Sequence, residues 1–162
     1  MSEQYEPWMR RALVLAREAE ASADVPIGAV VYDADGIEIA SACNERELSG
    51  DPTAHAEVLA LRRASAYLDS WRLVGCTLVV TLEPCTMCAG ATVLSRVARV
   101  VYGARDPKAG AVDSLYDVVR DPRLNHRPEV VGGVLADETG AILRDFFKAK
   151  RIKRAPNSLP AV

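Results

Sequence analysis

The segment Thr77-Leu78-Val79-Val80-Thr81-Leu82-Glu83-Pro84-Cys85-Thr86-Met87-Cys88 begins as an apolar, β-branched run and ends in a Cys-X-X-Cys pair. The run 77–82 has the length and composition of a short strand. Proline and the first cysteine after it suit the start of a helix, which we expect over about 86–95. A strand that leads directly into a helix is the repeating unit of α/β domains.

The elements predicted on either side also alternate. A helix is expected over about 7–22, because its apolar residues keep helical spacing. The runs 27–32 and 37–40 flank Asp33-Ala34-Asp35-Gly36, which has the composition of a hairpin turn. Further elements are predicted as helices over 54–68, 112–119 and 138–154 and as strands over 99–102 and 130–131. This order predicts α/β layers around one mixed sheet, with the functional site at strand ends.

A second segment, His55-Ala56-Glu57, adds an imidazole and a carboxylate 30 residues before Cys85. Structural zinc sites are usually closed by four protein ligands, whereas catalytic sites keep three and leave one position to water. His55, Cys85 and Cys88 therefore predict one catalytic zinc ion per chain, and such an ion lowers the pKa of its water toward about 7. Glu57 is not needed as a ligand and is predicted to carry protons.

The spacing of these residues also predicts where they lie. Residues at i and i+2 do not face each other in the middle of a helix, so His55 and Glu57 can converge on a metal only at a helix start. Thr53 is the N-cap residue that this arrangement requires. Cys85 and Cys88 suit the opening turn of a second helix, whose N-terminal dipole favours thiolates. Two helix N-termini are therefore predicted to meet at one metal.

Other interpretations of the same residues remain open. A Cys-X-X-Cys pair alone also fits a zinc knuckle, reduced cysteines in a core, or a thioredoxin-like redox pair. The upstream His-X-Glu and Pro84 favour the catalytic zinc site, because a redox pair needs neither. A non-catalytic subunit stabilised by zinc would bind the same metal, but it gives Glu57 no role.

Composition favours one domain in a reducing compartment. The chain has 162 residues, 49% of them hydrophobic, which suffices for one core. We expect a single domain over 1–154 and a frayed tail over 155–162. The acidic N-terminus does not resemble a signal peptide, and no stretch reaches the roughly 18 apolar residues of a membrane span. A cytoplasmic location without membrane contact is expected, where four cysteines serve as ligands or thiols.

Charge is distributed unevenly along the chain. The net charge of −2 argues mildly against a nucleic-acid-binding protein, but residues 1–81 carry net −6 and residues 82–162 carry net +4. The segment 144–154 has six basic residues and a single acidic one, Asp145. Such a run can pair with phosphates, or it can be a solvated helix end favoured by the helix dipole.

Several segments together resemble one family. They are Trp8-Met9, Val25-Pro26-Ile27-Gly28-Ala29-Val30, Asp51-Pro52-Thr53-Ala54-His55-Ala56-Glu57, the run 81–91, Gly103-Ala104-Arg105-Asp106, Asn125-His126-Arg127 and Asp145-Phe146-Phe147. These residues resemble zinc-dependent nucleoside and nucleotide deaminases, and within them the bacterial tRNA-specific adenosine deaminases. The resemblance covers nearly the whole chain.

The resemblance implies a three-layer α/β/α cytidine-deaminase-like fold with a central mixed five-stranded sheet. It implies a zinc-dependent hydrolase that converts adenosine to inosine at the wobble position of a tRNA anticodon stem-loop. It further implies a homodimer in which both subunits contact RNA. Met87-Cys88-Ala89-Gly90 is shared with some guanine deaminases, so deamination of a free base or nucleotide such as guanine is the alternative.

The resemblance also implies substrate-binding residues. Asn44 corresponds to a side chain that reads the target nucleoside, although it could equally be an ordinary turn asparagine. Asp106 before Pro107 has the same two interpretations, a contact to a flanking nucleotide or a turn aspartate. The other residues implied to contact RNA are Asn125, His126, Phe147, Lys148 and Arg151. Phe147 could instead belong to the core with Phe146, and His126 is interpreted as a loop residue rather than a fourth zinc ligand.

One residue departs from the pattern of the family. Asp113 places a carboxylate where the family more often has small neutral residues. If this segment touches RNA, we expect Asp113 to weaken the phosphate contacts.

Overall fold

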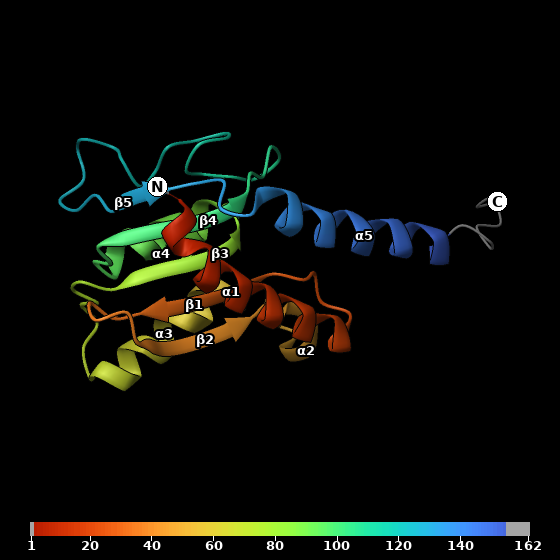
Figure 1. Ribbon diagram of the computed structural model, residues 1–162, viewed down its shortest axis with the longest axis horizontal. Helices are drawn as coiled ribbons and strands as arrows, with labels where there is room; N and C mark the ends of the chain where they lie inside the picture. Colours follow the sequence, from red (N-terminus) through yellow and green to blue (C-terminus); the bar gives the residue numbers. More distant parts are fainter. Residues whose placement is uncertain (1, 155–162) are drawn as a thin grey trace.

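The fold is built on a five-stranded mixed sheet with helices on both faces (Figure 1). The computed structural model describes residues 2–154. The strands are β1 (Gly28–Tyr32), β2 (Glu38–Cys43), β3 (Thr77–Leu82), β4 (Arg99–Ala104) and β5 (Glu129–Val131), in the spatial order β2-β1-β3-β4-β5. β1 pairs antiparallel with β2 and β3, whereas β4 pairs parallel with β3 and β5. The predicted mixed sheet is confirmed.

The helices form the two outer layers. They are α1 (Glu6–Ala19), α2 (Arg46–Ser49), α3 (Ala56–Leu68), α4 (Thr86–Leu94) and α5 (Ala136–Arg154), and the 3-10 turns are η1 (Glu3–Tyr5) and η2 (Glu20–Ser22). α1 covers one face of the sheet, where Met9 and Leu15 pack with Val79 and Val101. α3 and α4 cover the other face. The three-layer α/β/α architecture predicted from the resemblance is therefore confirmed.

The central strands are buried because helices cover both of their faces. Val79 and Val101 point to the α1 side, and Leu78 and Val100 point to the α3 and α4 side. This explains why residues 77–81 of β3 are all buried and do not alternate with exposed ones. β3 then passes into α4 within four residues, as its sequence predicted.

The first hairpin also agrees with its sequence. Asp33 Oδ1 accepts hydrogen bonds from the amides of Asp35 and Ile37, both at 2.9 Å. Gly36 has a φ of 78°, which favours glycine at this turn. β2 continues to Cys43, three residues beyond the predicted end, so that its last residue directly precedes Asn44.

α5 is anchored at its start and extends beyond the sheet at its end (Figure 1). Arg10 of α1 pairs with Glu138 at 3.0 Å, and Thr139 and Gly140 are buried. The helix begins two residues before the predicted 138 and ends at Arg154. No helix in the described part of the chain is long and apolar enough to cross a membrane.

The helix expected over 112–119 is wrong, because this segment forms turns whose amides donate to the Glu83 carboxylate. The short helix α2 was missed; Asp24 accepts hydrogen bonds from the Glu47 and Leu48 amides and caps it. The tail predicted for 155–162 lies outside the described residues.

Candidate active site

Two helices begin at the predicted metal ligands. His55 is the N-cap of α3 and Cys85 is the N-cap of α4, and both have extended backbone conformations. Thr53 is not the cap, so that prediction was wrong; its hydroxyl donates to Asp51 Oδ1 at 2.8 Å. With His55 at the cap, Glu57 lies in the first turn of α3, where residues i and i+2 can both face the site.

The three ligand atoms lie close enough to share one ion. His55 Nδ1 is 3.7 Å from Cys85 Sγ and 3.5 Å from Cys88 Sγ, and all three ligand atoms lie within 4.8 Å of one another. Tetrahedral zinc, with zinc–nitrogen bonds of about 2.05 Å and zinc–sulfur bonds of about 2.3 Å, holds nitrogen and sulfur about 3.6 Å apart. The donor set and its spacing therefore fit zinc, and the predicted meeting of two helix N-termini is confirmed.

Hydrogen bonds within the ligand set shift the pKa values of all three residues. A hydrogen bond from the Cys88 thiol, together with one from His55, lowers the pKa of Cys85 to about 3. The same contact with the Cys85 thiolate raises the pKa of Cys88, because Cys88 is the donor. The hydrogen bond with Cys85 also raises the pKa of His55. A metal ion binds in place of such protons, since zinc ligands are deprotonated when they bind.

Glu57 is buried against this ligand set. Its side chain is only 4% exposed, and its carboxyl group interacts with the Cys88 side chain. Burial raises the pKa of the Glu57 carboxyl above its usual range. A carboxylate in dry surroundings beside three ligands has the position required of a group that exchanges protons at the metal.

Asn44 is fixed by local hydrogen bonds close to the site. It is 3% exposed; its Nδ2 donates to the Val25 carbonyl and its Oδ1 accepts from the Arg46 amide, both at 3.2 Å. The next residue, Glu45, donates its amide to the carbonyl of Ala54, the residue before His55. The side chain is therefore rigid and lies on the segment that adjoins the first metal ligand.

Asp106 lies in a segment that touches the second ligand. Its Oδ1 accepts hydrogen bonds from the amides of Lys108 and Ala109, at 3.0 and 3.2 Å, as a turn aspartate does. The same segment forms a β-bridge between Gly110 and Cys85. Asp106 thus shapes a turn beside the metal ligands.

Asn125 and His126 lie at the opposite end of the sheet. The His126 Nε2–H donates to the carbonyl of Val97, which precedes β4, at 2.7 Å, whereas Cys85 follows the end of β3. A strand of six residues is about 20 Å long. Within one chain, the structure therefore does not bring Asn125 or His126 to the metal ligands, and His126 is not a fourth ligand.

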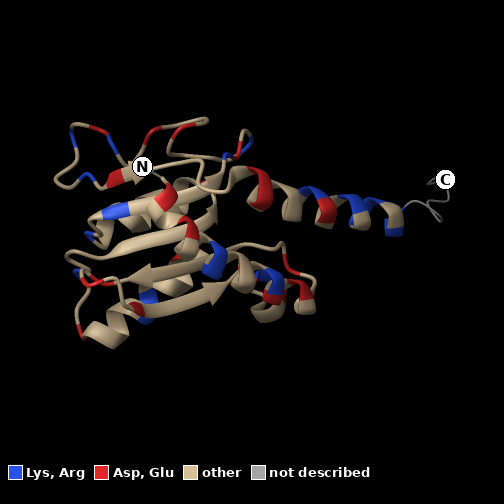
Figure 2. Ribbon diagram, viewed as in Figure 1, with Lys and Arg blue, Asp and Glu red and all other residues tan. Residues whose placement is uncertain are grey.

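The aromatic and basic residues of α5 are accessible. Phe147 is 41% exposed and contacts Phe146 edge to face, so the alternative that Phe147 belongs to the core is wrong. The basic residues of the helix end are all exposed and line its extended part (Figure 2); they are Lys148, Lys150, Arg151, Lys153 and Arg154.

Sequence reasoning gave no role to Glu83. It is 2% exposed, and its carboxylate receives the amides that replace the predicted helix over 112–119. The signal that could have found it is an acidic residue at the end of a continuous apolar strand, because a buried charge needs several partners.

Comparison with known proteins agrees with this site. Residues 2–104 match the family described as the cytidine and deoxycytidylate deaminase zinc-binding region. A tRNA-specific adenosine deaminase of Bacillus subtilis is 49% identical over 151 residues, which are 93% of this chain and 93% of that protein.

Two solved structures are similar over most of the chain. One, from work on A-to-I editing by tRNA:A34 deaminases, has a TM-score of 0.80 and 46% identity, covering 83% of this chain and 97% of that chain. A guanine deaminase from Nitrosomonas europaea has a TM-score of 0.76 and 30% identity, covering 87% and 83% respectively. The chain therefore belongs to the zinc-dependent cytidine and deoxycytidylate deaminase family, and its relatives include the tRNA-specific adenosine deaminases.

Proposed function

We propose that the protein converts adenosine to inosine at the wobble position of a tRNA anticodon, releasing ammonia. The observation that carries this proposal is the three-ligand metal site with the buried Glu57 carboxylate beside it. The similarity to tRNA-specific adenosine deaminases over 93% of the chain supports the choice of substrate.

The residues of the site have separate roles in metal binding and proton transfer. His55, Cys85 and Cys88 would hold zinc, which when bound makes a water-derived nucleophile available at neutral pH. Glu57 takes a proton from the attacking water and passes it to ring N1. It then takes the remaining proton of the hydroxyl added at C6 and gives it to the amine, which leaves as ammonia. The balanced reaction is adenosine plus water to inosine plus ammonia. Burial keeps the Glu57 carboxyl away from bulk solvent, so protons move between it and the substrate.

The positions of Asn44 and Asp106 beside the metal ligands support roles for both in substrate binding. Asn44 is proposed to read the target nucleoside, because its segment adjoins His55, and Asp106 to hold a flanking nucleotide from the segment beside Cys85. An anticodon loop suits this site because its single-stranded bases can be splayed outward without breaking a duplex.

We infer a homodimer for the remaining contacts. Asn125 and His126 are on the order of 20 Å from the metal ligands of their own chain, which supports the proposal that they contact nucleotides beside the target from a second subunit. Phe147, Lys148 and Arg151 lie on the extended part of α5, where a base can stack and phosphates can pair with the cations. We place the reaction in the cytoplasm, where cysteine ligands stay reduced.

Deamination of free guanine is the second candidate. The guanine deaminase structure has the same fold at 30% identity, and the zinc chemistry would be the same. This candidate leaves the exposed basic end of α5 without a role, because a free base carries no phosphates.

The test measures product on parallel substrates. Zinc-loaded protein is incubated with an anticodon stem-loop carrying adenosine at the wobble position, with the same stem-loop carrying adenosine one nucleotide away, and with free adenosine and guanine. The proposal predicts inosine in the first substrate only. Turnover of guanine alone would overturn the substrate and leave the zinc chemistry intact.

A further inference from the structure

One buried carboxylate outside the ligand set holds a long segment against the metal site. Glu83 lies between the end of β3 and Pro84, and its own amide continues the sheet by donating to the Ala104 carbonyl at 2.8 Å. Its side chain enters the turns of residues 106–114, here called the covering segment. The mechanism proposed above gives this carboxylate no part.

Five donors of the covering segment converge on Glu83. Oε1 accepts from the Asp106 amide at 3.2 Å and from the Ser114 hydroxyl. Oε2 accepts from the amides of Val112, Asp113 and Ser114 at 3.1, 2.9 and 3.0 Å. Hydrogen bonds to an ionised acceptor are about twice as strong as neutral ones. The covering segment therefore has a buried charged group at its centre, beside the core residues Ala111 and Val112.

The approach of this segment to Glu83 is too close for a side chain at Gly110. A Cβ there would lie 2.3 Å from Glu83 Oε2. Gly110 forms the β-bridge with Cys85, and the Ala111 amide donates to the Pro84 carbonyl at 2.8 Å. The residues that surround Glu83 thus contact the backbone of a metal ligand directly.

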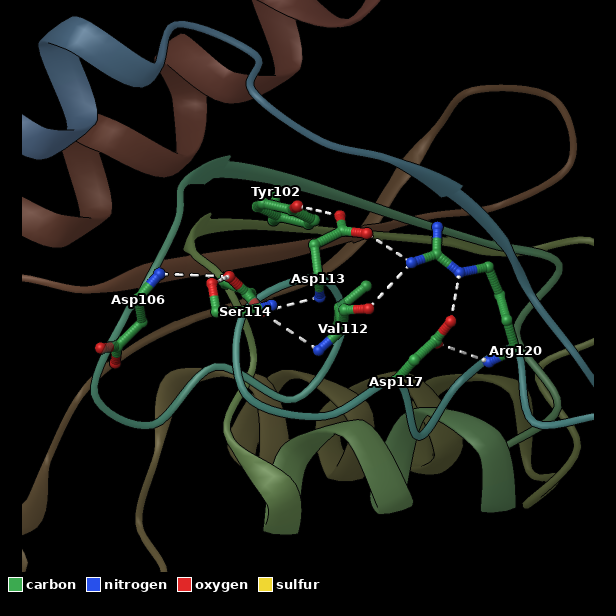
Figure 3. Close-up of polar contacts among 8 residues, drawn as sticks. Tyr102, Asp106, Val112, Asp113, Ser114, Asp117 and Arg120 are labelled. Atoms are coloured by element: carbon green, nitrogen blue, oxygen red, sulfur yellow. Dashed lines mark hydrogen bonds and ion pairs between the residues drawn. The ribbon is translucent and has the colours of Figure 1, made fainter.

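The outer side of the covering segment is fastened as well (Figure 3). The Tyr102 hydroxyl donates to the Asp113 carboxylate, and Arg120 pairs with the same carboxylate. Arg120 also donates to the Val112 carbonyl at 2.8 Å and pairs with Asp117 at 3.0 Å. The Asp113 charge is therefore neutralised within the chain, which changes the expectation that it repels phosphates.

We propose that Glu83 is a positioning residue for the deamination, because its carboxylate orders the covering segment and so fixes Asp106 and the Cys85 backbone for RNA binding. This inference rests on the proposed function. Replacement of the carboxylate by an amide removes its negative charge and one of its two acceptor oxygens, so the five donors are held more weakly and the ordered state of the segment becomes a minority. The apparent affinity for RNA then equals the affinity of the ordered state multiplied by the fraction of chains in which the segment is ordered.

The experiment compares Glu83→Gln with Glu129→Gln and with the unchanged protein, all zinc-loaded. Glu129 is an exposed residue that pairs with Arg99 near the other end of the sheet, so its variant controls for the loss of one carboxylate. Two readouts are taken: amide hydrogen exchange of peptides covering 106–114, and kcat and KM for the wobble-adenosine stem-loop.

Glu83→Gln is expected to keep one zinc per chain and to exchange at least about tenfold faster in 106–114, with α1 and α3 unchanged. KM should rise about tenfold and kcat should change less than about threefold. A purely structural role lowers the active fraction, which reduces kcat and leaves KM unchanged; that pattern would overturn the proposal, as would unchanged exchange.

Ser114→Ala keeps the test decisive if Glu83→Gln does not fold. It removes one of the five donors, so exchange over 112–114 should rise about threefold, and exchange identical to the unchanged protein would overturn the proposal. If the unchanged protein forms no inosine, the proposed function fails, while the exchange data still decide whether Glu83 orders the segment.

Discussion

The contact between α1 and β1 at Gly28 leads to a quantitative prediction. A Cβ at Gly28 would lie 2.0 Å from the Ala12 carbonyl oxygen and 2.7 Å from the Ala16 nitrogen. Both atoms are helix backbone, so no side chain can rotate away. Because Cβ contacts below 3.0 Å essentially do not occur, Gly28→Ala must move α1 from the sheet by about 1 Å.

That movement has a calculable cost. Met9, Ala12 and Leu15 of α1 are buried against the sheet, and lifting the helix loosens all of them. Overpacking a core costs roughly 1–3 kcal/mol, and backbone contacts justify the upper end of that range. At about 2–4 °C per kcal/mol for a chain of this size, Tm should fall by about 6–12 °C.

Gly90→Ala is the matched control. An added Cβ at Gly90, inside α4, meets nothing within 4 Å, and alanine is a better helix former by about 1 kcal/mol. Its Tm should rise by about 2–4 °C. Both variants are followed by circular dichroism on zinc-loaded protein. If Tm of Gly28→Ala stays within about 2 °C of the unchanged protein, the close packing of α1 on β1 is not what the structure describes.

Two further predictions concern the metal and the RNA. Cys85→Ser should reduce bound zinc to a small fraction and lower Tm, because metal binding contributes folding free energy. The control Cys76→Ser changes a buried cysteine outside the ligand set and should keep one zinc per chain. Zinc content is measured by metal analysis, and a full complement of zinc in Cys85→Ser would contradict the ligand set. The double variant Lys148→Ala, Arg151→Ala is tested by measuring stem-loop affinity at several salt concentrations. The slope of log affinity against log salt should fall by about 1.4, because each phosphate contact to a single strand contributes about 0.7. An unchanged slope would mean that these two residues do not contact the RNA phosphates.

The features that could be predicted from the sequence are those set by residues close together in the chain. The zinc ligands could be found because the metal requires particular side chains, and those side chains sit at helix starts recognisable from Pro84 and the His-X-Glu spacing. The β-branched run of β3 likewise favours a strand. These features depend on neighbours within a few residues.

The errors arose where distant residues decide. Val112, Leu115 and Val119 have helical spacing, but a helix there would take the amides that Glu83 binds from about 30 residues away. α2 was missed because its capping residue, Asp24, is more than 20 residues upstream. Hydrogen bonds over such separations leave no periodic signal in a sequence.

The structure separates the residues implied to bind substrate into two groups. It places Asn44 and Asp106 on segments beside the ligands and Asn125 far from them, and each of these side chains has a structural explanation or position independent of RNA. Their substrate contacts remain predictions of the proposed function.

The most direct test of the account is the activity and zinc content of Glu57→Gln. Glutamine keeps the size of the buried side chain but cannot carry a proton, and general acid–base catalysis contributes about 10²–10⁴-fold. The account predicts one zinc per chain and inosine formation on the wobble-adenosine stem-loop slower by about that factor. Loss of zinc, or a rate within about tenfold of the unchanged protein, would contradict the role given to Glu57.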